Sequence, residues 1–363
     1  MHLCTVLKND VRFSFANLLE HSVPPEILSE TFSHLIDGDS RNVILPSHVC
    51  SLWRETALQD TSLWTYIRLG DKNEYKRIAL AFLKTCIARA RGRLLSISVK
   101  PHNQYVSPNA YIFAIYESLM IQNDGKWESF SLTTTKITDC VLLFAFLARE
   151  SAPTVKTLSA TCLDRKNDYP IDGLLPQKLL GLQALPILQH LTLDFSHQFR
   201  QAKASVFWDR LTSLKVTSKM RSAKYLSILR LCVNLESCSI SPETRDDRDA
   251  LKGSYEPVHL AKLKKLEIFS YWVPSLVAVQ LVCPALEEAI IQFEVRYHEE
   301  AELASFFKKC AATLQVLKVP GSFCRVEKWA RPLENLQELT VTGGYDWDDV
   351  NSDHGATMPF REF

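Results

Sequence analysis

The sequence lacks the short motifs that mark common enzyme and metal sites. It contains no GxxxxGKS or GxxxxGKT loop, no GxGxxG loop, no GxSxG nucleophile motif and no HExxH zinc motif. His190 and Asp194 lie four residues apart on a predicted strand, which is about 13 Å and too far for a direct catalytic pair. We therefore expect no enzymatic activity, and the sequence indicates no metal site and no cofactor.

Paired cysteine motifs are also absent. The chain has ten cysteines but no CxxC and no Cys/His cluster with zinc-finger spacing. Most of the cysteines fall within apolar periodic segments, which predicts buried, reduced thiols that pack as small hydrophobic groups. This use of cysteine, together with the absence of any N-x-S/T sequon, favours a reducing compartment, the cytosol or the nucleus. The cysteines in apolar segments are Cys86, Cys140, Cys232, Cys238, Cys283 and Cys310.

An excess of charge of either sign is missing. Lys and Arg number 42 against 41 Asp and Glu, for a net charge of +1, which argues against nucleic acid or an anionic membrane as a partner. The longest apolar run, 140–148, covers about half a bilayer. The first apolar residues are interrupted by charges at Lys8, Asp10 and Arg12, unlike a signal peptide, so we expect no membrane anchor.

The stretch 23–67 is rich in aromatic and apolar residues with helical spacing. Pro24 and Pro25 suit a helix start, since the first-turn N–H groups have no intrahelical acceptor, and Glu26 opposes the positive end of the helix dipole. The residues that follow form one apolar stripe, and Asp37–Ser40 is a turn that ends this helix. The stripe consists of Ile27, Leu28, Thr31, Phe32 and Leu35.

A second helix is predicted after Pro46, with Ser47 as its N-cap. Apolar residues that follow this helix in the sequence extend its predicted apolar face. A unit of about 45 residues has too little interior to bury all of this surface, so part of it should need a partner. The face comprises Val49, Cys50, Trp53 and Ala57, and its extension comprises Leu58, Leu63, Trp64 and Ile67.

This ordered set resembles an F-box of the kind found in the large fungal F-box families. The matching elements are Pro-Pro-Glu-Ile-Leu, then Phe and Leu one and two turns later, then Val-Cys-x-x-Trp-Arg-x-x-Ala-Leu, then Leu-Trp. The match covers about an eighth of the chain, and Val23-Pro24 replaces the common Leu-Pro. The resemblance implies binding to the Skp-type adaptor of a cullin-RING ubiquitin ligase through Pro24, Pro25, Ile27, Leu28, Phe32, Leu35, Val49, Cys50, Trp53, Leu58 and Trp64. The alternative is that these helices cap an ordinary core, with Trp53 and Trp64 as core residues only.

After this stretch the sequence alternates between helix and strand patterns. A helix is predicted over 73–91 with Gly92 in its C′ position, followed by a half-buried strand over 95–99. Ser107-Pro108 begins another helix that extends to Met120, and Thr138-Asp139 begins one before the strand at 155–161.

A recurring phrase then becomes visible, with the form Φ-x-x-Φ-x-Φ, where Φ is apolar. Consecutive starts lie 22 to 33 residues apart, in or just above the range of leucine-rich repeats. A strand, a crossover and a parallel strand, repeated in one sense, predict an α/β fold in which a curved parallel sheet has helices on its convex side. The phrases resemble the degenerate leucine-rich repeats that follow many fungal F-boxes, but most lack the standard Asn or Cys, so we expect an irregular horseshoe. The phrases start at Leu94, Trp127, Val155, Leu188, Leu211, Leu235, Leu263, Leu286, Leu314 and Leu336.

These patterns divide the chain into four parts: an N-terminal segment at 1–20, the F-box at 21–70, the repeat solenoid at 71–345 and an acidic C-terminal tail at 346–363. The tail holds Trp347 among aspartates but has no calcium-loop spacing.

Within each phrase the Φ residues should point into the core, which leaves the residues that flank the last two Φ residues on the concave face. These residues are mostly Ser and Thr in the early strands and become charged and apolar from Lys265 onward. Phe269, Ile290 and Val316 should lie near one another, as on an interaction surface. The alternative is that the hydroxyl-rich strands reflect β-propensity alone. The predicted substrate-binding residues are Lys265, Glu267, Phe269, Glu288, Ile290, Gln292, Val316 and Lys318.

The sequence thus predicts the substrate-receptor subunit of a Skp-cullin-F-box ubiquitin ligase that recruits a protein substrate on its repeats. One alternative is a repeat scaffold with no ligase role. A nucleic-acid-binding repeat protein is disfavoured because the concave lysines are opposed by Asp194, Glu267, Glu288 and Glu338. The concave face has no dense arginine cluster, so a phosphorylated substrate motif is not expected.

Overall fold

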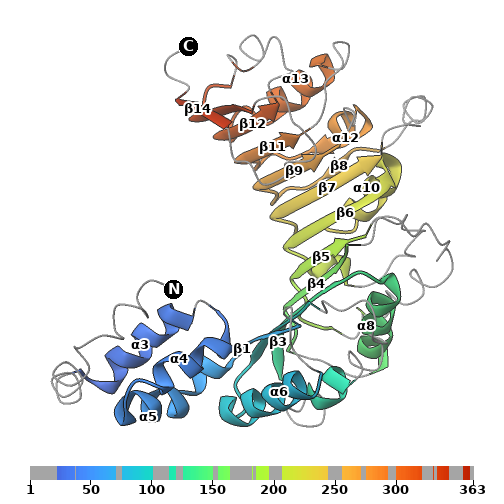
Figure 1. The fold of residues 1–363 in the computed structure, drawn as a ribbon. Coiled ribbons are helices and arrows are strands. Elements are labelled where there is room, and N and C mark those ends of the chain that lie inside the picture. Colours follow the sequence, from blue (N-terminus) through green and yellow to red (C-terminus); the bar gives the residue numbers. More distant parts are fainter. Residues whose placement is uncertain are drawn as a thin grey trace. The chain divides into compact units, whose positions relative to one another are not determined.

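The fold is described from a computed structural model of the chain (Figure 1). It comprises two compact units, Met1–Thr133 with Glu150–Val155, and Thr134–Arg149 with Lys156–Phe363, and each is described by itself. The structure describes residues 23–36, 38–70, 76–100, 114–119, 126–149, 154–163, 182, 185–195, 207–243, 256–270, 275–292, 300–320, 330, 333–342 and 355–359.

The first unit begins with helices and continues into parallel strands. Its elements are α3 (Pro25–Ile36), η1 (Ser40–Val43), α4 (Ile44–Ser47), α5 (Ser51–Gln59), η2 (Thr61–Trp64), β1 (Tyr66–Leu69), α6 (Lys76–Ala90), β2 (Leu95–Val99) and nearly all of β3 (Trp127–Thr134).

The predicted start of the first helix is confirmed. The backbone N–H groups of Ile27 and Leu28 both donate to the Pro24 carbonyl oxygen at 3.1 Å, and Pro25 is the first helical residue. Leu28, Phe32 and Ile36 recur every four residues and are buried, so one side of α3 packs on the unit.

The predicted start of the second helix is wrong. Ser47 ends the short helix α4, where its hydroxyl donates to the Ile44 carbonyl oxygen at 2.7 Å, and α5 begins at Ser51 after Cys50 in the N-cap position. Pro46 lies in the first turn of α4, where the missing N–H has no acceptor to lose. The proline therefore marks an earlier, separate helical turn.

The strands of the first unit are parallel, and they follow chain order. β1 pairs with β2, as in Ile67 with Ile97, and β2 pairs with β3. The sequence analysis did not predict β1, whose residues alternate between exposed and buried over only four positions. The helix before β2 ends at Ala90, one residue earlier than predicted, and both Arg91 (φ 50°) and Gly92 (φ 77°) have left-handed backbone conformations.

The second unit holds most of the repeats, and its strands also follow chain order. The order is β4-β5-β6-β7-β9-β11-β12-β13, all parallel, with β14 antiparallel to β13. These strands are β4 (Thr157–Cys162), β5 (His190–Asp194), β6 (Ser213–Arg221), β7 (Ser237–Glu243), β9 (Lys265–Phe269), β11 (Glu288–Gln292), β12 (Val316–Pro320), β13 (Glu338–Thr342) and β14 (Gly355–Pro359). The predicted α/β fold of repeated parallel strands is confirmed, whereas β14 was not predicted and lies within the predicted tail.

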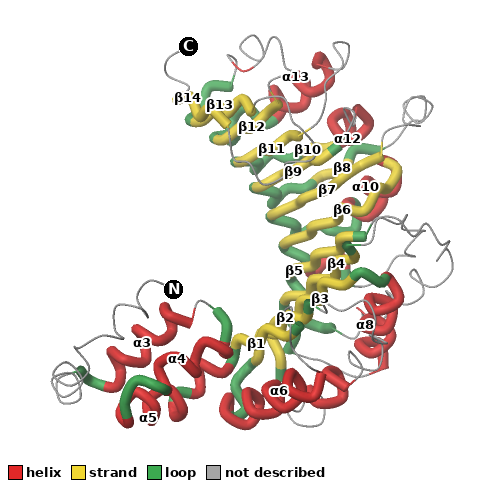
Figure 2. Tube along the Cα trace, in the orientation of Figure 1, coloured by secondary structure: helices red, strands yellow, loops and turns green. Residues whose placement is uncertain are grey.

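The helices of this unit lie on one side of the sheet (Figure 2). These helices are α8 (Ile137–Arg149), α10 (Ser222–Leu229), α12 (Ser275–Gln280) and α13 (Glu300–Lys309). The unit also contains the short elements η4 (Trp208–Arg210), β8 (Val258–His259) and β10 (Leu281–Val282). β8 and β10 pair with each other in parallel.

The Φ residues of the phrases form the core between the sheet and the helices. From the phrase at Leu188 to the phrase at Leu314, every Φ residue is at most 2% exposed. Val341, in the last phrase, is 36% exposed.

A ladder of side-chain hydrogen bonds joins the turns that precede successive strands. In each case the residue just before the first leucine of a phrase donates to the preceding turn. Its members, which we call the turn ladder, are Arg210 to Pro186 O (2.9 Å), Asn234 to Asp209 O (2.7 Å), Lys262 to Asn234 Oδ1 (2.8 Å), Thr313 to Pro284 O (3.1 Å) and Asn335 to Ala312 O (2.7 Å). The donor differs from one turn to the next, in agreement with the expected irregular repeat.

Candidate interaction surfaces

The first candidate surface is formed by α3, η1, α4 and α5. The eleven residues implied by the F-box resemblance fall into three groups by exposure. Leu28, Phe32 and Trp64 are buried, Cys50, Trp53 and Leu58 are half-buried, and Pro24, Pro25, Ile27, Leu35 and Val49 are exposed. The exposed group and the accessible part of the half-buried group can meet a partner without rearrangement, and whether any of the eleven contacts an adaptor remains a prediction.

On α3 the exposed apolar residues adjoin the buried face. Ile27, Thr31 and Leu35 recur every four residues and so form a flank beside the buried stripe. Ile27 is 52% exposed and Leu35 is 51% exposed. The Thr31 hydroxyl donates to the Ile27 carbonyl oxygen at 2.7 Å, which removes its polar donor from the flank.

The turn of α4 adds apolar residues that the sequence analysis missed. Ile44 and Leu45 are 51% and 54% exposed, and Val49, just beyond α4, is 58% exposed. The predicted second helix began after Pro46, so no helix was predicted over Ile44 and Leu45 and no helical spacing assigned them to a face. We call Ile27, Leu35, Ile44, Leu45 and Val49 the apolar docking set.

Trp53 and Trp64 have different surroundings. The Trp53 ring lies 5.1 Å from the Phe32 ring and is half-buried. Trp64 is buried, its indole N–H donates to the Ala57 carbonyl oxygen at 3.0 Å, and the Arg89 guanidinium lies 4.4 Å from the centre of its ring. Trp64 therefore joins the helical segment to α6 in the free chain.

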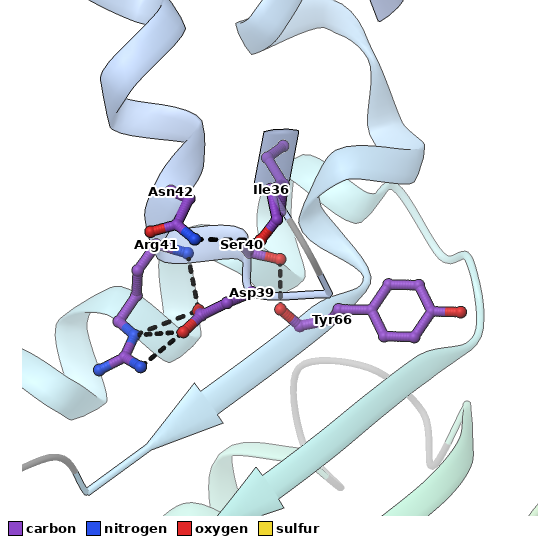
Figure 3. A network of polar contacts seen from close by, with 6 residues as sticks. All are labelled: Ile36, Asp39, Ser40, Arg41, Asn42 and Tyr66. Carbon is purple, nitrogen blue, oxygen red and sulfur yellow. Dashed lines mark hydrogen bonds and ion pairs between the residues drawn. The ribbon is translucent and has the colours of Figure 1, made fainter. Parts of the chain in front are cut away.

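A polar network joins the end of α3 to β1 (Figure 3). The Ser40 hydroxyl donates to the Tyr66 carbonyl oxygen at 2.5 Å, and the Asn42 amide donates to the Ile36 carbonyl oxygen at 3.0 Å. Asp39, which is 6% exposed, accepts from both Nε and Nη2 of Arg41. These contacts hold the helical segment and the first strand as one structure.

A groove of about 790 Å³ lies between α3 and α5, and its lining includes Glu26, Glu30, Glu55 and Asp60. Asp60 accepts hydrogen bonds from the Ser29 and Ser62 hydroxyls. Over the described ranges, no three His, Cys, Asp or Glu residues gather in a way that could hold a metal ion. Over the same ranges, no helix combines the length and apolarity needed to cross a bilayer.

The second candidate surface is the face of the second unit's sheet that lies opposite its helices, which we call the open face. Its side chains stand in rows set by the strand register. One row is Thr157, His190, Ser213, Ser237, Lys265, Glu288, Val316 and Glu338, and the next is Ser159, Thr192, Lys215, Ser239, Glu267, Ile290, Lys318 and Thr340. All eight predicted substrate-binding residues are half-buried on this face, and their role remains a prediction.

The charges in the later strands are paired with one another. Lys265 Nζ lies 3.2 Å from Glu267 and 3.3 Å from Glu288, and Lys318 Nζ lies 3.8 Å from Glu338. Desolvation lowers the pKa of Lys265, but the two carboxylates outweigh it and raise this pKa above its usual value. These two lysines and three glutamates carry one net negative charge.

The apolar residues of these strands lie on a diagonal. Ile290 pairs with Glu267 in register and Phe269 pairs with Gln292, while Val316 pairs with Glu288. Phe269, Ile290 and Val316 are thus diagonal neighbours across β9, β11 and β12, about 7–8 Å apart by Cα spacing. The sequence analysis predicted their proximity, and the register confirms it.

No family model and no curated protein matches this chain. Among solved structures, an internalin from Listeria monocytogenes is similar, with a TM-score of 0.36 and 13% sequence identity, over 84% of this chain and 75% of that chain.

Proposed function

We propose that this chain is the substrate-receptor subunit of a Skp-cullin-F-box ubiquitin ligase. The observation that carries the proposal is the apolar docking set, five large apolar side chains that are each about half exposed on segments whose sequence resembles an F-box. Burying the exposed half of such a side chain is worth roughly 1 kcal/mol, so together they would supply several kcal/mol to a complex.

In this proposal the helices at 21–70 bind the adaptor and the repeats at 71–345 recruit the protein substrate on the open face. Within the predicted tail at 346–363, β14 adds an antiparallel strand beside β13. The buried residues Leu28, Phe32 and Trp64 shape the adaptor surface rather than contact the adaptor. We assign this chain no catalytic residue, cofactor, nucleic acid or membrane partner, because its task is to position a substrate for ubiquitin transfer elsewhere. A complex of this kind works in the cytosol or nucleus.

The test is co-purification of the full chain with a Skp adaptor. The double variant Ile27→Asp, Val49→Asp places two charges in the docking set without touching the core. The control is Val233→Asp, which introduces the same charge at an apolar residue that is 54% exposed in the second unit. We expect the wild type and the control to retain the adaptor and the double variant to lose it, with unchanged circular dichroism. An adaptor that fails to bind the wild type, or that binds the double variant equally well, contradicts the proposal.

The second candidate is a repeat scaffold in which the helices only cap the first strands. The contacts of Trp64 with Ala57 and Arg89, and of Ser40 with Tyr66, favour it, because they bury part of the helical segment against the rest of the first unit. A folded wild-type chain that binds no adaptor would support this candidate.

A further inference from the structure

One lysine of the open face differs from its neighbours. Lys265 and Lys318 each pair with glutamates, but Lys215 on β6 is exposed, and among the described residues no carboxylate forms an ion pair with it. Its register neighbours are Thr192 on β5 and Ser239 on β7. The carboxylate of Asp194, on a diagonal from Lys215, accepts the Thr217 hydroxyl. Lys215 thus forms no ion pair with a carboxylate of the described residues, although Asp194 on the diagonal and Glu267 in its own row lie on the same face.

Hydrogen-bond donors surround Lys215. Ser213 and Ser237 occupy the adjacent row, and next to them His190 is exposed. Ser239 is only 5% exposed, and its hydroxyl has no hydrogen-bond partner. Because Ser239 lies between the longer side chains of Lys215 and Glu267, its hydroxyl sits at the floor of this part of the face. A buried hydroxyl without a partner is a donor that a bound group can satisfy.

The apolar diagonal begins two strands away. From β6 the order of strands is β7, β9 and β11, so Lys215 and Ile290 stand in the same row three strands apart. At the usual strand separation this is about 14 Å. An extended peptide advances about 3.3 Å per residue and points every second side chain to the same side, so residues four apart span this distance on one face.

We propose that the open face binds an extended peptide segment with a carboxylate side chain at Lys215 and an apolar side chain four residues away at Ile290. The inference rests on the proposed function and deepens it, because it names the chemistry of the substrate segment. The single ammonium of Lys215, with serine hydroxyls beside it, is suited to bind a carboxylate. The two rows of the open face contain no arginine that could bind a phosphate in bidentate fashion. Glu267 stands between the two subsites, so an acidic residue midway along the segment is disfavoured.

The test uses the full chain and fluorescein-labelled twelve-residue peptides with a Gly/Ser background. In the probe peptides, Glu and Leu lie four residues apart. One probe has Glu before Leu and the other has Leu before Glu, because the two subsites do not fix the direction in which the segment binds. In the matched peptides one feature of the probe is changed. Glu is replaced by Gln or by phosphoserine, the separation of Glu and Leu is reduced to one residue, or a second Glu is added midway between them. Binding is measured by fluorescence anisotropy at two salt concentrations, because an exposed ion pair weakens as salt rises.

We expect one order of the probe to bind at least tenfold more tightly than its Gln and short-spacing counterparts. Lys215→Gln should erase the difference between Glu and Gln peptides, and Lys215→Arg should keep it. The matched control Lys308→Gln removes the same charge from an exposed lysine on α13, on the other side of the sheet, and should change nothing. No binding at millimolar peptide, equal binding of Glu and Gln peptides, or a tenfold preference for phosphoserine overturns the proposal.

Failure here is distinguishable from failure of the proposed function. If the adaptor binds and the probes do not, the receptor role stands and this peptide site is wrong. If the probes bind with the expected Lys215 dependence and the adaptor does not, the peptide site stands on a scaffold without a ligase role.

Discussion

The side-chain N–H of Asn234 donates a hydrogen bond to the Asp209 carbonyl oxygen at 2.7 Å, and the Asn234 Oδ1 accepts one from the Lys262 ammonium at 2.8 Å. It therefore connects three successive turns of the second unit. The turn ladder to which Asn234 belongs has a gap at Ala285, which occupies the equivalent position before Leu286. The methyl group of Ala285 cannot donate a hydrogen bond.

Filling this gap should stabilise the chain. We expect Ala285→Asn to raise the free energy of unfolding by about 0.5–1 kcal/mol, the net value of an added hydrogen bond. Ala285→Asp, of the same shape but without an N–H donor, is the matched control and should give no gain. Urea unfolding monitored by circular dichroism measures both. Equal stability of the Asn and Asp variants would argue against an amide bond at this position.

Trp64 should contribute to the stability of the free chain. Trp64→Phe removes the indole donor to Ala57 and leaves a small void, at a cost of about 1–3 kcal/mol. Arg89→Met keeps the apolar stem beneath the ring but removes the cation, at a cost of about 0.5–1 kcal/mol. Thermal unfolding without any partner is the measurement. If Trp64 served mainly as a contact to another protein, neither substitution would lower the unfolding temperature.

Gly92 should resist substitution for a conformational reason. Its φ of 77° is in the left-handed region, while a Cβ built there would meet only Lys126 Nζ, at 3.9 Å. Gly92→Ala should therefore cost about 1–2 kcal/mol through its backbone alone, and Gly92→Asn should cost less because asparagine adopts this conformation more readily. Chemical denaturation of both variants gives the ranking, and an alanine variant as stable as the wild type contradicts it.

The buried thiols should react slowly in the native protein. Burial raises the pKa of Cys86 and of Cys232 from 9.0 to about 12, and that of Cys310 to about 11. At pH 8 the thiolate fraction of Cys86 falls about a thousandfold, since each unit of pKa is a factor of ten, and burial excludes the reagent as well. Cys50, which is half-buried, should be alkylated first among the described cysteines.

Iodoacetamide labelling at pH 8, mapped by mass spectrometry with and without urea, tests this order. Urea should equalise the rates. Rapid native labelling of Cys86 or Cys232 would show that these thiols are not held in a closed core.

Much of the repeat architecture could be predicted because its signal is local. In the phrase that starts at Leu188, polar and apolar residues alternate with strand period over 190–194, and the spacing from the next phrase leaves room for one crossover. The same reasoning failed for β1, which has only four residues, and for β14, which does not follow the repeated phrase and pairs antiparallel to the last repeat strand. It also misplaced α5, because Pro46 suits the first turn of any helix and belongs to α4.

The candidate surfaces divide in a similar way. The spacing of residues on α3 predicts which side is apolar, but not that Leu28 is buried while Ile27 and Leu35 stay exposed, since burial depends on what packs against the helix. Likewise, alternation places Lys215, Lys265 and Lys318 on one face, but the pairing of two of them depends on the register with glutamates of neighbouring strands.

The sequence by itself determined the type and order of the repeated elements and the side of each strand that faces the core, because hydrophobic periodicity acts within a few residues. Only the tertiary structure decided which apolar residues remain exposed, which charges are neutralised and where the turn ladder is broken. These properties depend on contacts between residues 20 to 30 positions apart, such as Asn234 with Asp209, and no local pattern encodes such distances.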